Sequence, residues 1–206
     1  MSSIFDLFKK IESERQPVKQ ITYIVAGLGN PGKEYAKTRH NAGFMALDLY
    51  CEKNGLSMTK VKFNSLTAEV DISGIRVLLM KPQLYMNRSG ECIRDAANFY
   101  KIPAENVLVL CDDVQLDVGK IRIRRKGSDG GQKGLRDIIY QLNSDAFPRL
   151  RIGVGKLPQG GNMVNWVLGA IPQELCDDLG IALSNAVSAI PMLVGGNIDD
   201  AMSRYN

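Results

Sequence analysis

The sequence predicts a single α/β domain in which helices cover both faces of a twisted, mixed β-sheet. Short apolar runs rich in β-branched residues alternate along the chain with helix-like segments. The 206 residues, 45% of them hydrophobic and 23% charged, suit one compact domain. The sequence has no internal repeat and no linker rich in Pro, Gly or Ser. Alternating strands and helices typically give a sheet covered on both sides.

The N-terminal half of the domain is predicted to begin with a buried strand. Residues 21–30 (ITYIVAGLGN) form a β-branched run that ends in glycines, and residues 44–55 follow with a helical pattern. Residues 66–82 are typical of a hairpin with its turn near Ser73-Gly74, and residues 90–102 of a helix that ends before a proline. The hairpin makes the predicted sheet mixed, because its strands are antiparallel.

The C-terminal half is predicted to supply further strands and helices. Strands are expected over 106–113, 119–126 and 148–155, and helices over 134–142 and most of 173–194. Apolar and basic residues alternate in the second of these strands, which is typical of a strand with one buried face. Residues 155–162 (GKLPQGGN) predict a mobile loop.

Residues 1–20 are predicted to form a short amphipathic arm ahead of the domain at 21–206. Ile4, Leu7 and Phe8 fall at helical spacing, which favours docking onto the same chain over binding a membrane or a partner. The arm lacks a secretory cleavage site, and no run approaches the length of a membrane span. We therefore expect a cytoplasmic protein without a transmembrane helix.

The cysteine and histidine content argues against a metal site. The four cysteines are scattered without a Cys-x-x-Cys pair, and His40 is the only histidine. This composition offers no convincing ligand set for zinc. We expect reduced, mostly buried thiols and no metal.

Basic residues concentrate in one stretch, although the formal net charge is only +4. Residues 119–136 hold seven lysines and arginines against one acid, Asp129. This local asymmetry predicts a polyanionic partner.

Polar residues follow three of the predicted strands. Asn30 follows the first strand, Asn87 follows the hairpin, and Asp112 and Asp113 end a later strand, while His40 lies in the first loop. Taken singly, each is more often a turn, capping or surface residue. Ligands of open α/β sheets bind beyond the carboxyl ends of the strands, so the five are expected to share one site.

These residue types suit hydrolysis of an acyl bond. A neutral imidazole takes a proton from water, and a carboxylate on its other nitrogen fixes the tautomer. An asparagine amide donates to the oxygen on which charge develops. Because no serine or cysteine stands out as a nucleophile, we interpret His40 as a general base for attack by water.

A competing motif is the G-x-G-x-x-G pattern of Gly27, Gly29 and Gly32, which follows a strand as in dinucleotide-binding folds. The third glycine should open a helix, but eleven residues (KEYAKTRHNAG) precede a good helical pattern. Pro31 suits a tight turn better than a pyrophosphate cradle. A nucleotide-dependent oxidoreductase is therefore discounted, and no cofactor is expected.

The chain resembles the bacterial-type peptidyl-tRNA hydrolases over most of its length. The likeness rests on GLGNPGKEYAKTRHNAGF, YMNRSG, LVLCDDVQLDVGKIRIR, GSDGGQKGLRDII and RLRIGVG. It implies a single α/β domain, usually monomeric and without metal or cofactor, that hydrolyses the ester joining a peptide to tRNA. The polyanionic partner is then tRNA.

The resemblance also implies roles for single residues. His40 matches the catalytic base, Asp112 its carboxylate partner, and Asn87 the amide that stabilises the tetrahedral intermediate. The remaining matches are substrate-binding positions at Asn30, Tyr35 and Met86 and a basic pair at Arg124 and Arg151 that clamps the 5′-phosphate of tRNA.

The likeness departs from the family pattern at Gln132-Lys133, where His-Asn is usual. The asparagine helps hold the substrate and a water, whereas Lys133 donates hydrogen bonds but cannot accept them. We expect Lys133 to bind the acceptor end of the substrate. The departure also keeps a second function open, that of an RNA-binding module with weak hydrolysis, as in some chloroplast relatives that serve RNA splicing.

Overall fold

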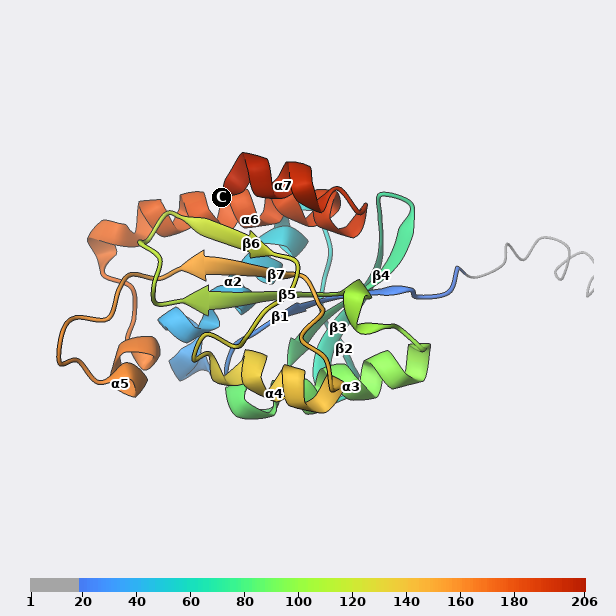
Figure 1. Ribbon diagram of the computed structural model, residues 1–206, viewed down its shortest axis with the longest axis horizontal. Coiled ribbons are helices and arrows are strands. Elements are labelled where there is room, and N and C mark those ends of the chain that lie inside the picture. Colours follow the sequence, from blue (N-terminus) through green and yellow to red (C-terminus); the bar gives the residue numbers. More distant parts are fainter. Residues whose placement is uncertain (1–18) are drawn as a thin grey trace, which may run out of the picture.

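A computed structural model describes residues 19–206, so most of the predicted arm at 1–20 lies outside the described residues. Seven strands form one sheet in the order β2-β3-β4-β1-β5-β7-β6 (Figure 1). Their bounds are β1 (Tyr23–Gly27), β2 (Lys60–Lys62), β3 (Ser65–Ile72), β4 (Ile75–Pro82), β5 (Val107–Asp113), β6 (Ile121–Arg124) and β7 (Arg149–Gly153). β1 pairs in parallel with β4 and β5, while the β3–β4 hairpin and the β6–β7 pair are antiparallel. The predicted mixed sheet is confirmed.

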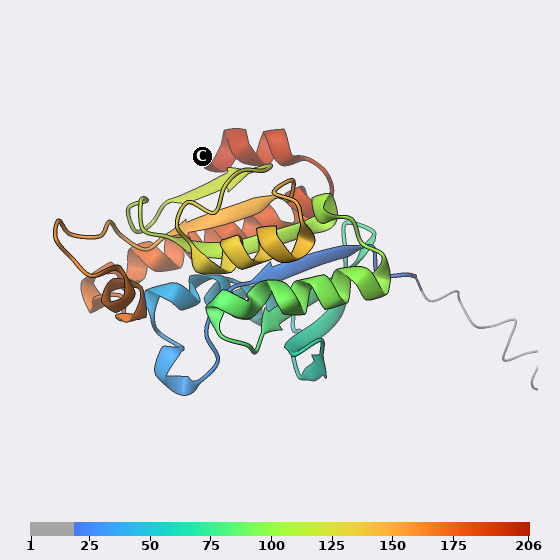
Figure 2. The same ribbon diagram turned by 60° about the horizontal axis from the view of Figure 1, so that its bottom comes forward.

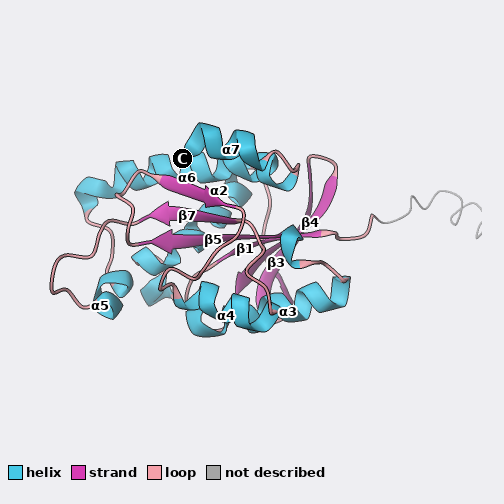
Figure 3. Cartoon of the chain, in the orientation of Figure 1, coloured by secondary structure: helices cyan, strands magenta, loops and turns pink. Residues whose placement is uncertain are grey.

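Helices cover both faces of the sheet, as predicted (Figures 2 and 3). One face carries α2 (Ala42–Lys53), α6 (Cys176–Val194) and α7 (Ile198–Tyr205), and the other carries α3 (Ser89–Tyr100) and α4 (Lys133–Leu142). The short helix α5 (Met163–Leu168) lies beyond the carboxyl ends of β5 and β7 (Figure 1). Short 3-10 turns complete the framework: η1 (Lys33–Tyr35), η2 (Arg39–Asn41), η3 (Met86–Arg88), η4 (Ala104–Asn106) and η5 (Gln173–Leu175).

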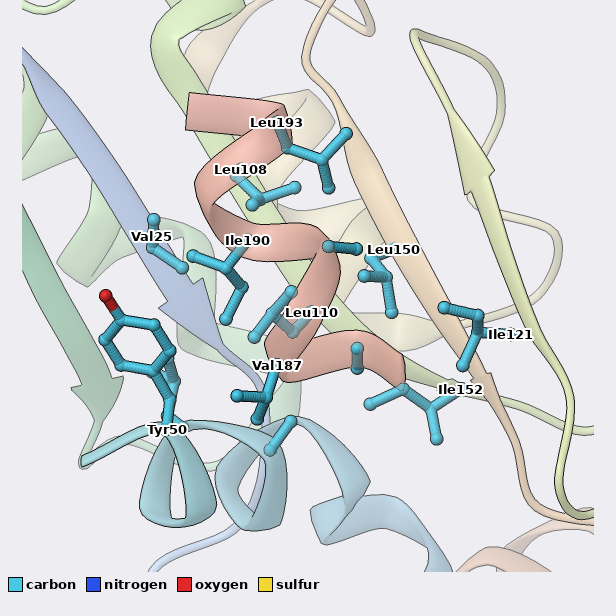
Figure 4. Packing of buried hydrophobic residues seen from close by; sticks show 14 of the residues in the cluster. Val25, Tyr50, Leu108, Leu110, Ile121, Leu150, Ile152, Val187, Ile190 and Leu193 are labelled. Atoms are coloured by element: carbon cyan, nitrogen blue, oxygen red, sulfur yellow. The ribbon is translucent and has the colours of Figure 1, made fainter. Parts of the chain in front are cut away.

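The central strands are buried on both faces because they are continuous apolar runs. On one face, Leu108 and Leu110 of β5 meet Val187 and Ile190 of α6 (Figure 4). The other face packs against α3 and α4 through a second cluster that includes Ile93. Each such large apolar side chain contributes about 1.5–3 kcal/mol on burial, so both layers hold the sheet in place.

The long helix α6 illustrates how a core helix resembles a membrane span. By length and composition alone, residues Gln173–Val194 meet the requirements for crossing a bilayer. In the structure, however, the helix lies against the sheet and α2, with Ala182, Ala186 and Leu193 in the hydrophobic core. Its apolar composition is accounted for by this packing.

The β6–β7 edge carries the predicted alternation. Ile121 and Ile123 are buried, whereas Arg122 and Arg124 are exposed. The antiparallel register sets Arg122 opposite Arg151 of β7 and Arg124 opposite Arg149. Directly opposed residues share a face of the sheet, so the four arginines lie on one side of this edge.

Two glycines allow the end of β1 to approach the start of α2. A Cβ on Gly43 would overlap the backbone oxygen of Leu110 and the backbone nitrogen of Leu28. A Cβ on Gly27 would meet the backbone oxygen of Gly43 in turn. The first loop, with His40 just before α2, is therefore held against the ends of β1 and β5.

We expect Gly43→Ala to lower the free energy of unfolding by about 1–3 kcal/mol or more, because the added methyl overlaps backbone rather than a flexible side chain. Gly180→Ala in α6 is the matched control: nothing lies within 4 Å of the added Cβ. That control should stabilise the protein by about 0.5–1 kcal/mol through helix propensity. Urea unfolding of the two variants measures both changes, and a Gly43→Ala variant as stable as the wild type would contradict the packing described.

Candidate active site

His40 and Asp112 form a buried pair at the carboxyl end of β5. The Nδ1 atom of His40 lies 3.0 Å from both carboxylate oxygens of Asp112. The two residues are only 8% and 3% exposed. His40 belongs to η2, directly before α2, and Asp112 is the penultimate residue of β5. With the carboxylate ionised, Nδ1 carries the proton and Nε2 keeps a lone pair.

A chain of amide hydrogen bonds joins the first loop to the segment after β4. The side chain of Asn41 accepts from the backbone nitrogen of Asn30 and donates to its carbonyl oxygen, both at 2.9 Å. The Oδ1 of Asn30 in turn accepts from the backbone nitrogen of Met86 at 2.8 Å. All three residues are buried. This chain fixes η3 relative to η2.

Gln132 also contacts the pair, a contact that the sequence did not predict. Its Nε2 lies 3.0 Å from Asp112 Oδ1 and 3.2 Å from the sulfur of Met86. Its Oε1 accepts from the backbone nitrogen of Leu135 and so caps the N-terminus of α4. Lys133, the next residue, is exposed at the first position of that helix.

A cavity of about 850 Å³ opens over the pair. Asn30, Tyr35, Met86 and Asn87 line it, as do Gln132 and Lys133. One wall is apolar and comes from α5, with Met163, Val164, Val167 and Leu168. Another is basic, with Lys133, Arg136 and Arg151. The cavity therefore combines apolar and basic side chains around one imidazole.

The two predicted phosphate-binding arginines differ in position. Arg151 lines the cavity, and its Nε lies 3.0 Å from a carboxylate oxygen of Asp113. Arg124 is exposed on β6 and is not among the residues that line the cavity. The register makes the two arginines diagonal neighbours on one face, within reach of each other's long side chains. Arg149 lies opposite Arg124 and two residues before Arg151 on β7. It is buried and donates to the carbonyl oxygens of Ser128 and Asp145.

Arg39 ties the apolar wall at α5 to the η2 turn that carries His40, a role that no sequence pattern indicated. Its guanidinium donates to the carbonyl oxygens of Val154 and Ala170 and lies 3.8 Å from the ring centroid of Trp166. Burial lowers the pKa of Arg39 from its usual value. The only signal in the sequence is its position next to His40.

None of the cysteines of residues 19–206 lines the cavity. Cys111 adjoins Asp112 in the sequence and is fully buried. Burial and the neighbouring carboxylate of Asp112 raise the pKa of its thiol far above the usual range, so it stays protonated and unreactive. Within residues 19–206, no cluster of three His, Cys, Asp or Glu side chains is arranged to hold a metal ion.

The comparisons with known proteins agree on one family. The family model described as Peptidyl-tRNA hydrolase matches residues 24–206. The chain is 53% identical over 184 residues to the peptidyl-tRNA hydrolase of Caldanaerobacter subterraneus, covering 89% of this chain and 99% of that protein. It is 50% identical over the same length to the enzyme of Thermoanaerobacter sp. strain X514, with the same coverage.

A solved structure supports the same assignment. The crystal structure of peptidyl-tRNA hydrolase from Acinetobacter baumannii matches with a TM-score of 0.83 at 35% sequence identity. The match covers 91% of this chain and 96% of that one. The sequence, the fold and the cavity with its histidine–aspartate pair lead to one conclusion: the chain belongs to the peptidyl-tRNA hydrolase family.

Proposed function

We propose that this chain hydrolyses the ester bond between peptide and tRNA in peptidyl-tRNA, releasing tRNA for reuse in translation. The observation that carries the proposal is the buried His40–Asp112 pair beneath a cavity with amide donors at its rim. Membership of the peptidyl-tRNA hydrolase family supports it. Residues 21–206 act as the catalytic domain.

His40 acts as the general base. Asp112 accepts a hydrogen bond from Nδ1–H and stabilises the imidazolium that forms when Nε2 takes a proton from water. The water oxygen bonds to the acyl carbon, and the π electrons of the carbonyl group move onto the carbonyl oxygen, which becomes the oxyanion. Collapse of the tetrahedral intermediate breaks the bond to the ribose oxygen, which takes the proton back from His40. The products are a peptide carboxylic acid and free tRNA.

Two asparagines complete the reaction centre. Asn87 is exposed at the cavity and donates its amide to the developing oxyanion. One such donor is worth about 10²–10³ in rate. Asn30 already accepts from Met86 through Oδ1, so its Nδ2 is the atom that donates to the peptide end of the substrate.

Different walls of the cavity bind different parts of the substrate. Met86 and Tyr35 contact the substrate near the scissile ester, and Tyr35 packs edge-on against Tyr85 with ring centroids 6.5 Å apart. Lys133 attracts the acceptor end of the tRNA at the basic wall. Arg124 and Arg151 hold the 5′-phosphate, because the planar guanidinium matches phosphate oxygens. We propose that the protein works as a cytoplasmic monomer without metal or cofactor.

The second candidate function is an RNA-binding module with little hydrolysis. Lys133 favours the binding module, because a lysine has no acceptor atom with which to replace the side-chain oxygen of the asparagine usual at this position. The intact set of His40, Asp112, Asn30 and Asn87 favours the enzyme, since a binding module does not need it. A hydrolysis assay separates the two functions.

Purified wild type should hydrolyse an N-blocked aminoacyl-tRNA, and His40→Ala should lose about 10²-fold or more of that activity as the general base is removed. A chelator should leave the wild-type rate unchanged. Release of acid-soluble aminoacyl product measures both. A wild type that binds the tRNA without turnover would contradict the enzyme function and support the RNA-binding module.

Arg124→Ala should lower kcat/KM for substrate carrying a 5′-phosphate by about tenfold, the effect of one lost charge-assisted hydrogen bond. It should leave a dephosphorylated substrate nearly unaffected. Arg204→Ala, which removes the same charge from exposed α7, is the control and should not discriminate between the two substrates. Equal losses of Arg124→Ala on both substrates would rule out a specific phosphate contact.

A further inference from the structure

The amide of Gln132 is held in one orientation. Its Oε1 lies 2.7 Å from the backbone nitrogen of Leu135, an atom that can only donate. The oxygen is therefore committed to capping α4, and the NH₂ group must point the other way. There it meets Asp112 Oδ1 at 3.0 Å. The orientation follows from the backbone and does not depend on a choice between two equivalent amide rotamers.

The oxygen that Gln132 reaches is one that His40 also uses. Asp112 Oδ1 lies 3.0 Å from His40 Nδ1 and 3.0 Å from Gln132 Nε2. A buried carboxylate needs several donors to remain ionised and in one orientation. Asp112 is 3% exposed and Gln132 is 8% exposed, so water contributes little.

We propose that Gln132 is a positioning residue: it turns the Asp112 carboxylate toward His40 and transmits the placement of α4 to the general base. This inference rests on the proposed function, in which His40 takes the proton from water. The same NH₂ group lies 3.2 Å from the sulfur of Met86, whose backbone nitrogen donates to Asn30. Gln132 thereby connects the His40–Asp112 pair to the hydrogen-bonded chain of Asn30 and Met86.

A glutamine at position 132 supplies a hydrogen-bond donor that does not depend on pH. The NH₂ group of glutamine is a donor at every working pH, because it does not titrate. A histidine, usual at this place in the family pattern, offers an N–H to Asp112 in only one of its neutral tautomers. The orientation of Asp112 in this chain is thus supplied by a group that is insensitive to pH.

Gln132→Glu tests the proposal most sharply, because it keeps an oxygen to cap α4 and replaces only the donor. The introduced carboxylate repels Asp112 and cannot donate to it while ionised. We expect kcat on N-blocked aminoacyl-tRNA to fall about tenfold to a hundredfold, the effect of losing a hydrogen bond to a charged group. KM should stay within about twofold, because Gln132 lines the cavity but is only 8% exposed and is assigned no contact with the substrate.

A comparison of pH values provides a signature that mere misfolding would not give. Two carboxyl groups this close share a proton, and a protonated carboxyl donates again. The deficit of Gln132→Glu relative to wild type at the same pH should therefore shrink between pH 8 and pH 5. The other titratable or charged groups around Asp112 are His40 on η2, Cys111 and Asp113 on β5, and Arg151, which pairs with Asp113. Lys133, Arg136 and Asp137 of α4 line the same cavity. All are present in both proteins, but the added carboxylate also acts on His40. The fraction of neutral His40 is therefore read from its ¹⁵N resonances in each protein, and the two kcat values are compared after division by that fraction.

Two further variants complete the experiment. Asn162→Asp makes the same amide-to-carboxylate change at the N-cap of α5, away from Asp112, and should leave kcat unchanged. Gln132→His restores an N–H donor and should recover most of the wild-type kcat. A Gln132→Glu kcat within twofold of wild type, a deficit that does not change with pH, or a loss confined to KM would each overturn the proposal.

A readout that does not need activity separates this inference from the proposed function. His40 is the only histidine, so the imidazole ¹⁵N resonances of an untagged protein belong to it alone. Gln132→Glu should shift these resonances away from the wild-type positions, whereas Asn162→Asp should not. An inactive wild type would contradict the proposed function, and unchanged resonances in Gln132→Glu would contradict the role of Gln132.

Discussion

The rest of the site depends on one buried carboxylate. Asp112, the penultimate residue of β5, has almost no solvent contact, and it is held by His40 from η2 and by Gln132 from the N-cap of α4. A buried ionised group without partners costs several kcal/mol, so these contacts are also conditions of folding. Two segments, 72 and 20 positions away in the sequence, must converge on it. The sheet order, which places β1 beside β5, brings the first of them, η2, to the end of β5. The contacts of Asp112 with His40 and Gln132 therefore contribute both to the stability of the fold and to the proposed reaction.

The glycines on either side of the first loop, Gly27 at the end of β1 and Gly43 at the start of α2, make this convergence possible. Gly27 and Gly43 let the backbone of β1 and α2 approach so closely that a side chain on either would overlap backbone atoms. Asn41 then binds both backbone groups of Asn30, and Asn30 binds the backbone of Met86. Two glycines of the pattern that resembles a dinucleotide fingerprint are accounted for by the packing of α2: a Cβ on Gly27 would meet the backbone of Gly43, and one on Gly29 would meet the ring of Phe44. The same packing sets His40 over Asp112.

Much of this was predictable from the sequence, because residues at the ends of parallel strands meet at one edge. Asn30, Asn87, Asp112 and His40 were predicted to meet on that ground, and the structure brings them to one cavity. The sheet, its hairpin and the buried face of β6 follow from local patterns. The contact of Gln132 with Asp112 was not predictable, because it depends on where α4 begins relative to β5. The pattern of Met163–Leu168 is too short to separate a helix from a loop, and the burial of Arg39 depends on carbonyl groups more than 100 positions away in the chain.

The proposed mechanism requires one particular tautomer of the His40 ring. If His40 is the base, its neutral form must carry the proton on Nδ1, facing Asp112, and leave Nε2 free toward the cavity. Long-range ¹⁵N–¹H correlation spectra of the untagged wild-type protein near pH 8 measure this directly, since the chain has a single histidine. We predict a protonated Nδ1 and an unprotonated Nε2. A proton on Nε2 instead would place the lone pair of the neutral ring on Nδ1, against Asp112, leave none to accept a proton from water in the cavity, and contradict the mechanism.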